Sequence, residues 1–164
     1  MDSENANKSK KKKTSNIIQI CIGVLAVMLA ALIIVMMGIV SSIQGTARVV
    51  NYAGLVRGKT QRIIKLEISG QPEDGMIQDI EALVDGLRNG NGELGLVRLD
   101  DGAFQSKMQE LDDYFAALHD EILRVREVGY ENTEIIDKSE RFFEICDEAT
   151  GLAEAYSQRK ASSL

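Results

Sequence analysis

Hydrophobic residues follow two different patterns along the chain. Residues 17–40, IIQICIGVLAVMLAALIIVMMGIV, form a run of 24 residues that carries no charge. After this run, apolar positions recur at alternating steps of three and four residues, and this spacing places side chains on one side of a helix. The patterns predict one helix that is apolar all round, followed by helices with a single apolar face.

Four helical segments are predicted after residue 43, and no segment alternates as a strand would. The first continues directly out of the apolar run. The predicted breaks and caps are Gly70 and Pro72 after the first helix, the glycines of residues 90–95 after the second, Asp100 or Asp101 before and Gly129 after the third, and Asn132 or Thr133 before the fourth. Residues 94–99, LGLVRL, are predicted as a loop that packs apolar side chains on the helices, because an isolated strand has no partner.

The positions that face the core follow from the same spacing. They are Val49, Ala53, Val56, Thr60 and Ile63 on the first helix, Met76, Ile80, Leu83 and Leu87 on the second, Phe104, Met108, Leu111, Phe115, Leu118, Ile122 and Val125 on the third, and Ile135, Ser139, Phe142, Cys146, Ala149, Ala153 and Tyr156 on the fourth. Short connections and heptad spacing predict an all-α, antiparallel up-down four-helix bundle, with helices crossing at about 20°.

The apolar run is predicted to be a transmembrane helix, because 24 residues rising about 1.5 Å each span a hydrocarbon core of about 30 Å. A cleaved signal peptide is the alternative, but its apolar stretch is usually only about 7 to 15 residues long. Five lysines precede the run and predict a cytoplasmic N-terminus. The predicted organisation is a cytoplasmic basic tail (1–16), a transmembrane helix (17–43), an extracytoplasmic domain (44–160) and a C-terminal end (161–164) before an expected second membrane helix.

Composition excludes several classes of function. Residues 44–164 contain fourteen Lys and Arg against twenty-three Asp and Glu, a net charge of −9, so binding to nucleic acid is not expected. Cys21 and Cys146 are predicted to be buried apolar residues that do not meet. With one histidine, His119, predicted to be solvated or ion-paired, the chain offers no metal or cofactor site. No phosphate-binding loop or catalytic grouping is recognisable, so no enzymatic activity is expected.

A basic stretch follows the apolar run. Residues 46–62, TARVVNYAGLVRGKTQR, contain four basic residues and no acidic one. Helical spacing places Val50, Gly54, Arg57, Gln61 and Ile64 on one stripe, flanked by Asn51 and Gly58. If two copies meet along this stripe, their Arg57 side chains converge and repel each other unless an anion lies between them. The alternative, which spacing alone leaves open, is that Arg57 pairs with a carboxylate of a neighbouring helix.

The same stretch resembles a motif of known receptors. An apolar residue, Asn-x-Ala-Gly-x-x-Arg, four residues and a second Arg are found here as Asn51, Ala53, Gly54, Arg57 and Arg62. The pattern is similar to the first helix of the extracytoplasmic sensor domains of nitrate/nitrite sensor kinases and PilJ-type chemotaxis transducers. The resemblance implies a dimeric four-helix bundle in which the arginine that matches Arg57 binds an anion between the subunits. Residues 58–60 are Gly-Lys-Thr where nitrate sensors usually have Met-Gln-Ser, so nitrate is one candidate among several.

The sequence therefore predicts a membrane-embedded, homodimeric sensor module of a bacterial signalling receptor. The candidate ligand-binding residues are Asn51, Gly54, Arg57, Gln61 and Arg62, and the expected ligand is a small molecule such as an anion. The alternative is a membrane-anchored scaffold whose helices bind another protein.

Overall fold

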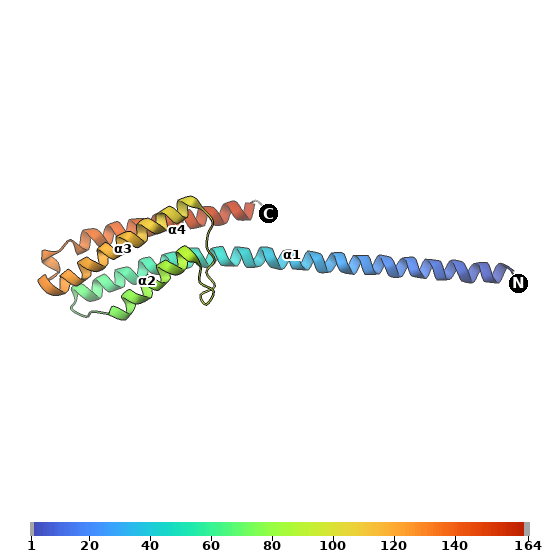
Figure 1. Cartoon of the computed structure of the whole chain (residues 1–164), viewed down its shortest axis with the longest axis horizontal. Helices are drawn as coiled ribbons and strands as arrows, with labels where there is room; N and C mark the ends of the chain where they lie inside the picture. The colour runs from blue at the N-terminus through green and yellow to red at the C-terminus, as the bar shows by residue number, and fades with distance from the viewer. Residues whose placement is uncertain (1, 163–164) are drawn as a thin grey trace. The chain divides into compact units, whose positions relative to one another are not determined.

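The computed structural model describes the backbone of residues 2–162 and the side chains of residues 17–41 and 43–162. Its elements are α1 (Asp2–Ile68), α2 (Asp74–Asn89), α3 (Gly102–Val128), the short helix η1 (Tyr130–Asn132) and α4 (Ile135–Ser162) (Figure 1). No strand forms among residues 2–162, where one isolated bridge joins Asn91 to Leu96. The prediction of an all-helical chain is confirmed. The side chains of the predicted tail (1–16) and the last two residues of the predicted C-terminal end lie outside the described part.

The chain divides into two compact units, Met1–Ser41 and Ser42–Leu164. In the first unit, the large apolar side chains of residues 17–40 are exposed around nearly the whole helix. Among the described residues, α1 is the one helix that is long and apolar enough to cross a membrane, judged by length and composition. A helix that is apolar on all sides is stable only in apolar surroundings.

In the second unit, side chains from all four helices form one hydrophobic core. Every core position predicted for α1 and α3 is buried. Phe115 of α3 packs on Phe142 of α4, with ring centroids 5.5 Å apart. Three predicted core residues, Met76, Ser139 and Tyr156, are only partly buried. Helical spacing thus located the core with few exceptions.

Most of the predicted helix ends are confirmed. The Asp101 carboxylate accepts a hydrogen bond of 2.9 Å from the backbone nitrogen of Phe104 and so caps α3. Gly129, with φ of +80°, ends α3, and Gly70, with φ of +70°, follows the end of α1. Glycine adopts these left-handed conformations without a steric cost.

The start of α4 differs from the prediction of a cap at Asn132 or Thr133. Asn132 belongs to η1, and α4 begins at Ile135. The Thr133 hydroxyl does not cap the helix, because it donates a hydrogen bond of 2.7 Å to the carbonyl oxygen of Tyr130. The chain therefore makes one extra turn before α4, and the cap must come from elsewhere.

Residues 94–99 form a loop, as predicted, and bury Leu96 and Leu99 in the core. The loop leads into α3, which is joined to α4 by several ion pairs. These pairs are Asp101–Arg159 at 2.8 Å, Lys107–Glu148 at 2.6 Å, Glu110–Arg141 at 3.1 Å and Glu121–Lys138 at 2.6 Å.

Candidate functional site

Arg57, the central residue of the predicted site, faces α4. Its guanidinium group forms an ion pair with the Asp147 carboxylate, and its central carbon lies 4.9 Å from the centroid of the Phe143 ring. Both partners are accessible, because the side chains of Arg57 and Asp147 are 37% and 59% exposed. Within one chain, Arg57 therefore makes the pairing with a carboxylate that was the alternative to an anion site.

The other four predicted site residues lie along α1 and are not brought together with a second functional group. Asn51, Gln61 and Arg62 are exposed, and Gly54 is half-buried. A Cβ atom added to Gly54 would have no neighbour within 4 Å. These four positions of α1 are thus uncovered within the described part of the chain, and another helix is able to approach there, but Ile64 of the predicted stripe is buried in the chain's own core.

The surroundings of Arg57 are acidic. A shallow cavity of about 340 Å³ beside the ion pair is lined by Phe143, Glu144, Asp147 and Glu148. Its carboxylates repel an anion, so one chain alone does not form an anion pocket at Arg57. Cys146, which precedes Asp147 in the chain, is buried, and this burial raises the pKa of its thiol to about 12. The thiol is therefore protonated at neutral pH and is a poor nucleophile.

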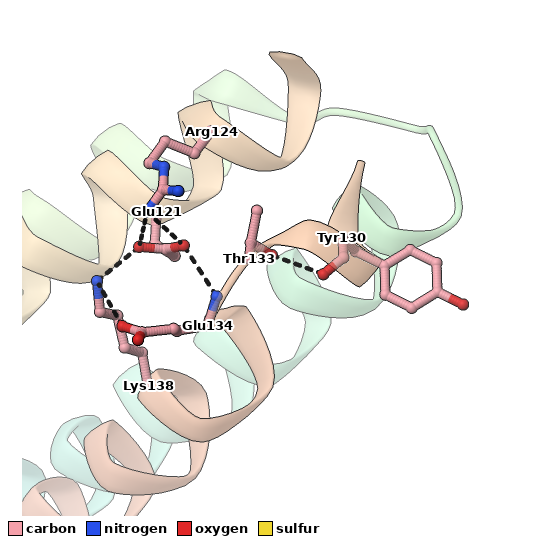
Figure 2. Close-up of polar contacts among 6 residues, drawn as sticks. All are labelled: Glu121, Arg124, Tyr130, Thr133, Glu134 and Lys138. Carbon is pink, nitrogen blue, oxygen red and sulfur yellow. Dashed lines mark hydrogen bonds and ion pairs between the residues drawn. The ribbon is translucent and has the colours of Figure 1, made fainter. Parts of the chain in front are cut away.

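A buried carboxylate that the sequence reading missed closes the turn between α3 and α4 (Figure 2). Glu121 is 1% exposed and accepts hydrogen bonds from Lys138 Nζ at 2.6 Å and from the backbone nitrogen of Glu134 at 3.0 Å. Arg124 Nη1 adds a longer contact of 3.3 Å. Glu121 thus replaces the missing cap of α4, because the Glu134 amide is one of the amides that a helix start leaves without a helical partner.

The electrostatics of this network are mutually stabilising. The hydrogen bond from Lys138, followed by that from the Glu134 amide, lowers the pKa of Glu121 below its ordinary value. The hydrogen bond to Glu121 raises the pKa of Lys138. Both groups are therefore charged across the neutral range. A signal for this site was present in the sequence, since position 121 lies three residues after Leu118 and four before Val125, on the buried face.

A second buried carboxylate joins three helices. Glu67, on the last turn of α1, is 5% exposed and accepts hydrogen bonds from Arg126 Nε at 3.0 Å and Nη2 at 2.5 Å. The same Nη2 also donates to Asp74 of α2 at 2.6 Å. The two-pronged geometry satisfies Glu67 and raises the pKa of Arg126. Arg126 is therefore bound by two carboxylates of the chain itself, those of Glu67 and Asp74.

His119 faces a carboxylate, in line with one of its two predicted roles. Its Nδ1 lies 3.5 Å from Glu81, beside a shallow cavity of about 300 Å³ between α2 and α3 that Leu123 and Arg126 also line. No serine, threonine, cysteine or lysine side chain lines this cavity. The arrangement is that of an accessible polar contact between two helices.

No protein-family model, curated protein or solved structure matches the chain. The assignment of a function therefore depends on the geometry of these residues and on the sequence pattern around Arg57.

Proposed function

We propose that this chain is the membrane-anchored, extracytoplasmic sensor module of a bacterial signal-transduction receptor. A small ligand, an anion in our reading, binds at Arg57 where two copies of the chain meet. Binding displaces α1 relative to α4, and the displacement passes through the membrane to an output domain. We assign no catalytic activity to these residues.

The proposed architecture is an antiparallel up-down four-helix bundle. It is supported by the order of the ion pairs, because the α3 partners 101, 107, 110 and 121 meet the α4 partners 159, 148, 141 and 138. As the residue numbers rise along α3, those of the α4 partners fall, as they do in a pair of antiparallel helices. The Arg57–Asp147 pair and the contact of 3.2 Å between the hydroxyls of Thr46 and Ser157 follow the same rule for α1 and α4.

The proposed orientation rests on the five lysines that precede the apolar run. Positive residues favour the cytoplasmic side, so the unit Ser42–Leu164 lies outside the cell membrane. In this orientation α1 leaves the membrane, and α4 returns toward it. A shift between these two helices is the movement that a receptor of this kind transmits, typically by about 1 to 2 Å.

The observation that carries the proposal is that Arg57 links α1 to α4 through one exposed carboxylate. Exposed ion pairs contribute only about 0 to 1 kcal/mol, so an incoming anion can displace Asp147 at little cost. Arg126 offers a contrast, because the buried Glu67 holds two of its nitrogens. Among these two arginines, only Arg57 is able to exchange its partner readily.

A second copy of the chain supplies a second Arg57, which one chain lacks. Two chains anchored in the same membrane and related by an axis along its normal hold their Arg57 residues at the same height. Asn51, Gly54, Gln61 and Arg62 lie on the uncovered part of α1, where a second α1 is able to approach. Two guanidinium groups then face the anion once it has displaced Asp147, and the neighbouring carboxylates Glu144 and Glu148 are already paired with Arg141 and Lys107.

Calorimetric titration of the full chain in detergent tests the proposal. Nitrate, nitrite, sulfate, phosphate and small carboxylates are added to the wild type, Arg57→Ala and Asp147→Asn. We expect one of these anions to bind the wild type, to bind Asp147→Asn more tightly because its competitor is gone, and not to bind Arg57→Ala. Arg141→Ala, which removes an exposed arginine between Glu110 and Glu144, serves as the matched control and keeps wild-type affinity. An anion that binds Arg57→Ala as well as the wild type contradicts the site.

One observation favours the scaffold alternative. Four large apolar side chains near the turn between α3 and α4 are 41–49% exposed, namely Leu123, Val128, Tyr130 and Ile136. Exposed apolar side chains that lie close together are typical of a surface that binds a protein partner. If no anion in the series binds and replacing Tyr130 and Ile136 by serine abolishes a protein complex that forms in the native membrane, the scaffold reading replaces the sensor.

A further inference from the structure

We propose that the groove between α2 and α3 binds a small aliphatic diamine, a short methylene chain with an ammonium group at each end. The groove lies wholly within the unit Ser42–Leu164. It shares no residue with the anion site at Arg57, so the inference goes beyond the function proposed above and does not depend on it.

The groove is the cavity of about 300 Å³ beside His119, and a charged contact lies at each of its ends. At one end, Arg126 of α3 donates a hydrogen bond of 2.6 Å to Asp74 of α2. At the other end, Nδ1 of His119 lies 3.5 Å from Glu81 of α2. Seven residues separate the two contacts on each helix, so the groove extends over a helical rise of about 10.5 Å.

The middle of the groove is apolar. Ile77 of α2 and Leu123 of α3 line it between the two charged contacts. Ile77 is 3% exposed, whereas Leu123 is 43% exposed, so Leu123 leaves apolar surface in contact with water. A methylene chain that lies in the groove covers this surface, and the removal of apolar surface from water is favourable.

The charges around the groove favour a cation. Arg126 is already neutralised, because the buried Glu67 accepts hydrogen bonds from its Nε and Nη2. The carboxylates of Asp74 and Glu81 remain, and the net charge of the four groups is 1 − 3 = −2. A bound ammonium group is therefore attracted at both ends, and an anion is repelled.

Both exposed carboxylates are able to accept a further hydrogen bond. One oxygen of Asp74 accepts the bond from Arg126, and the other has no polar partner among the described residues. Glu81 faces His119 alone, at a separation that exceeds the about 2.7 to 3.2 Å of an ordinary hydrogen bond. The side chains of Asp74 and Glu81 are 69% and 52% exposed. An ammonium group, which carries three donors, is able to bind either of them.

The spacing of the two carboxylates fits a diamine. In 1,4-diaminobutane, five bonds join the two nitrogens, and an extended chain advances about 1.2 Å per bond, which gives about 6 Å. A charge-assisted hydrogen bond of about 2.8 Å at each end extends this length to about 11.5 Å. The value is close to the rise of about 10.5 Å between Asp74 and Glu81.

Calorimetric titration of the full chain in detergent with 1,4-diaminobutane tests the inference. We expect Glu81→Gln and Asp74→Asn each to bind about tenfold more weakly than the wild type, because each variant loses one hydrogen bond between charged groups. Butylamine, which has one ammonium group, should be weaker by a similar factor. The matched control is Asp79→Asn, because Asp79 also lies on α2, is 61% exposed and pairs with Lys59, but does not line the groove. It should keep the wild-type affinity within about twofold, because solvent screens charges outside the site.

His119 is the single histidine of the chain, so its imidazole signals in nuclear magnetic resonance spectra report on this groove. The diamine should shift these signals with the midpoint that calorimetry gives. Signals that do not move, equal binding of butylamine, or equal losses in Asp79→Asn and Glu81→Gln would show general attraction to an acidic surface and overturn the site. An absence of binding to the wild type also overturns it, and leaves the anion site at Arg57 to its own titration.

Discussion

Replacing Glu121 should reveal how strongly a buried carboxylate secures the turn between α3 and α4. The Glu121 side chain is 2% exposed, whereas those of Lys138 and Arg124 are 28% and 55% exposed. Glu121→Ala removes the cap of α4, at a cost of about 1 kcal/mol. It also removes a charge-assisted hydrogen bond that contributes about 1.5 to 3 kcal/mol.

The expected loss is below the sum of these values, because the cations that remain are able to turn toward water. We expect Glu121→Ala to lower the free energy of unfolding by about 2 to 3 kcal/mol, less than the about 3 to 5 kcal/mol of a fully buried pair. Glu121→Gln keeps an acceptor for the Glu134 amide and should lose about 1 to 1.5 kcal/mol. In a domain of this size, the alanine variant should melt about 8 to 12 °C lower than the wild type.

The assay is urea unfolding of the full chain in detergent, followed by far-ultraviolet circular dichroism. Glu110→Ala is the matched control, because Glu110 also lies on α3 and pairs with two cations, Lys107 and Arg141, but is 40% exposed. It should lose less than about 1 kcal/mol. Equal losses for Glu110→Ala and Glu121→Ala would refute the view that burial makes the Glu121 network strong.

Three further predictions follow from the same contacts. The folded-state pKa of Glu121 is lowered, so its stabilising effect is present above its unfolded pKa of about 4.3 and is lost as the pH falls through the folded value. In acid titrations, the difference in stability between the wild type and Glu121→Gln should therefore stay constant from about pH 5 to 8 and shrink below about pH 4. Gly45→Ala should destabilise the chain in thermal melts, because its Cβ would lie 2.8 Å from the Val97 side chain. Gly54→Ala should instead stabilise the monomer by up to about 1 kcal/mol, because its Cβ meets nothing within 4 Å. If Gly54→Ala were the less stable of the two variants, this packing would be contradicted. Asp101→Ala should lose about 1 kcal/mol in urea unfolding through the α3 cap, and Asp101→Asn should recover most of it.

The fold followed from the sequence wherever a local pattern decided the structure. The steps of three and four on α3, from Phe104 to Val125, correspond to side chains that are all buried, because a helix that meets one core has one face to bury. Gly70 and Gly129 ended helices where their positive φ angles were needed. The start of α4 was misplaced because its cap, Glu121, lies thirteen residues earlier in the chain than the amide it serves.

The contacts of the candidate site were harder to predict from the sequence than the fold. Asp147 is ninety residues away from Arg57, and spacing along α1 does not identify which of many carboxylates on other helices it meets. Glu67 and Glu121 were overlooked because acidic residues are seldom buried unless they are paired. Their partners, Arg126 and Lys138, became clear only once the helices were packed.

The central claim is that two copies of α1 meet at Arg57 and that an anion lies between them, and disulfide cross-linking tests it most directly. Gly54→Cys in a Cys21→Ser background is oxidised in native membranes, with Asp113→Cys on the exposed face of α3 as the control. We predict that Gly54→Cys links into a dimer much faster than Asp113→Cys, and that a bound anion changes this rate only while Arg57 is present. Equal rates at the two positions, or the same response to the anion in Arg57→Ala, would contradict the claim.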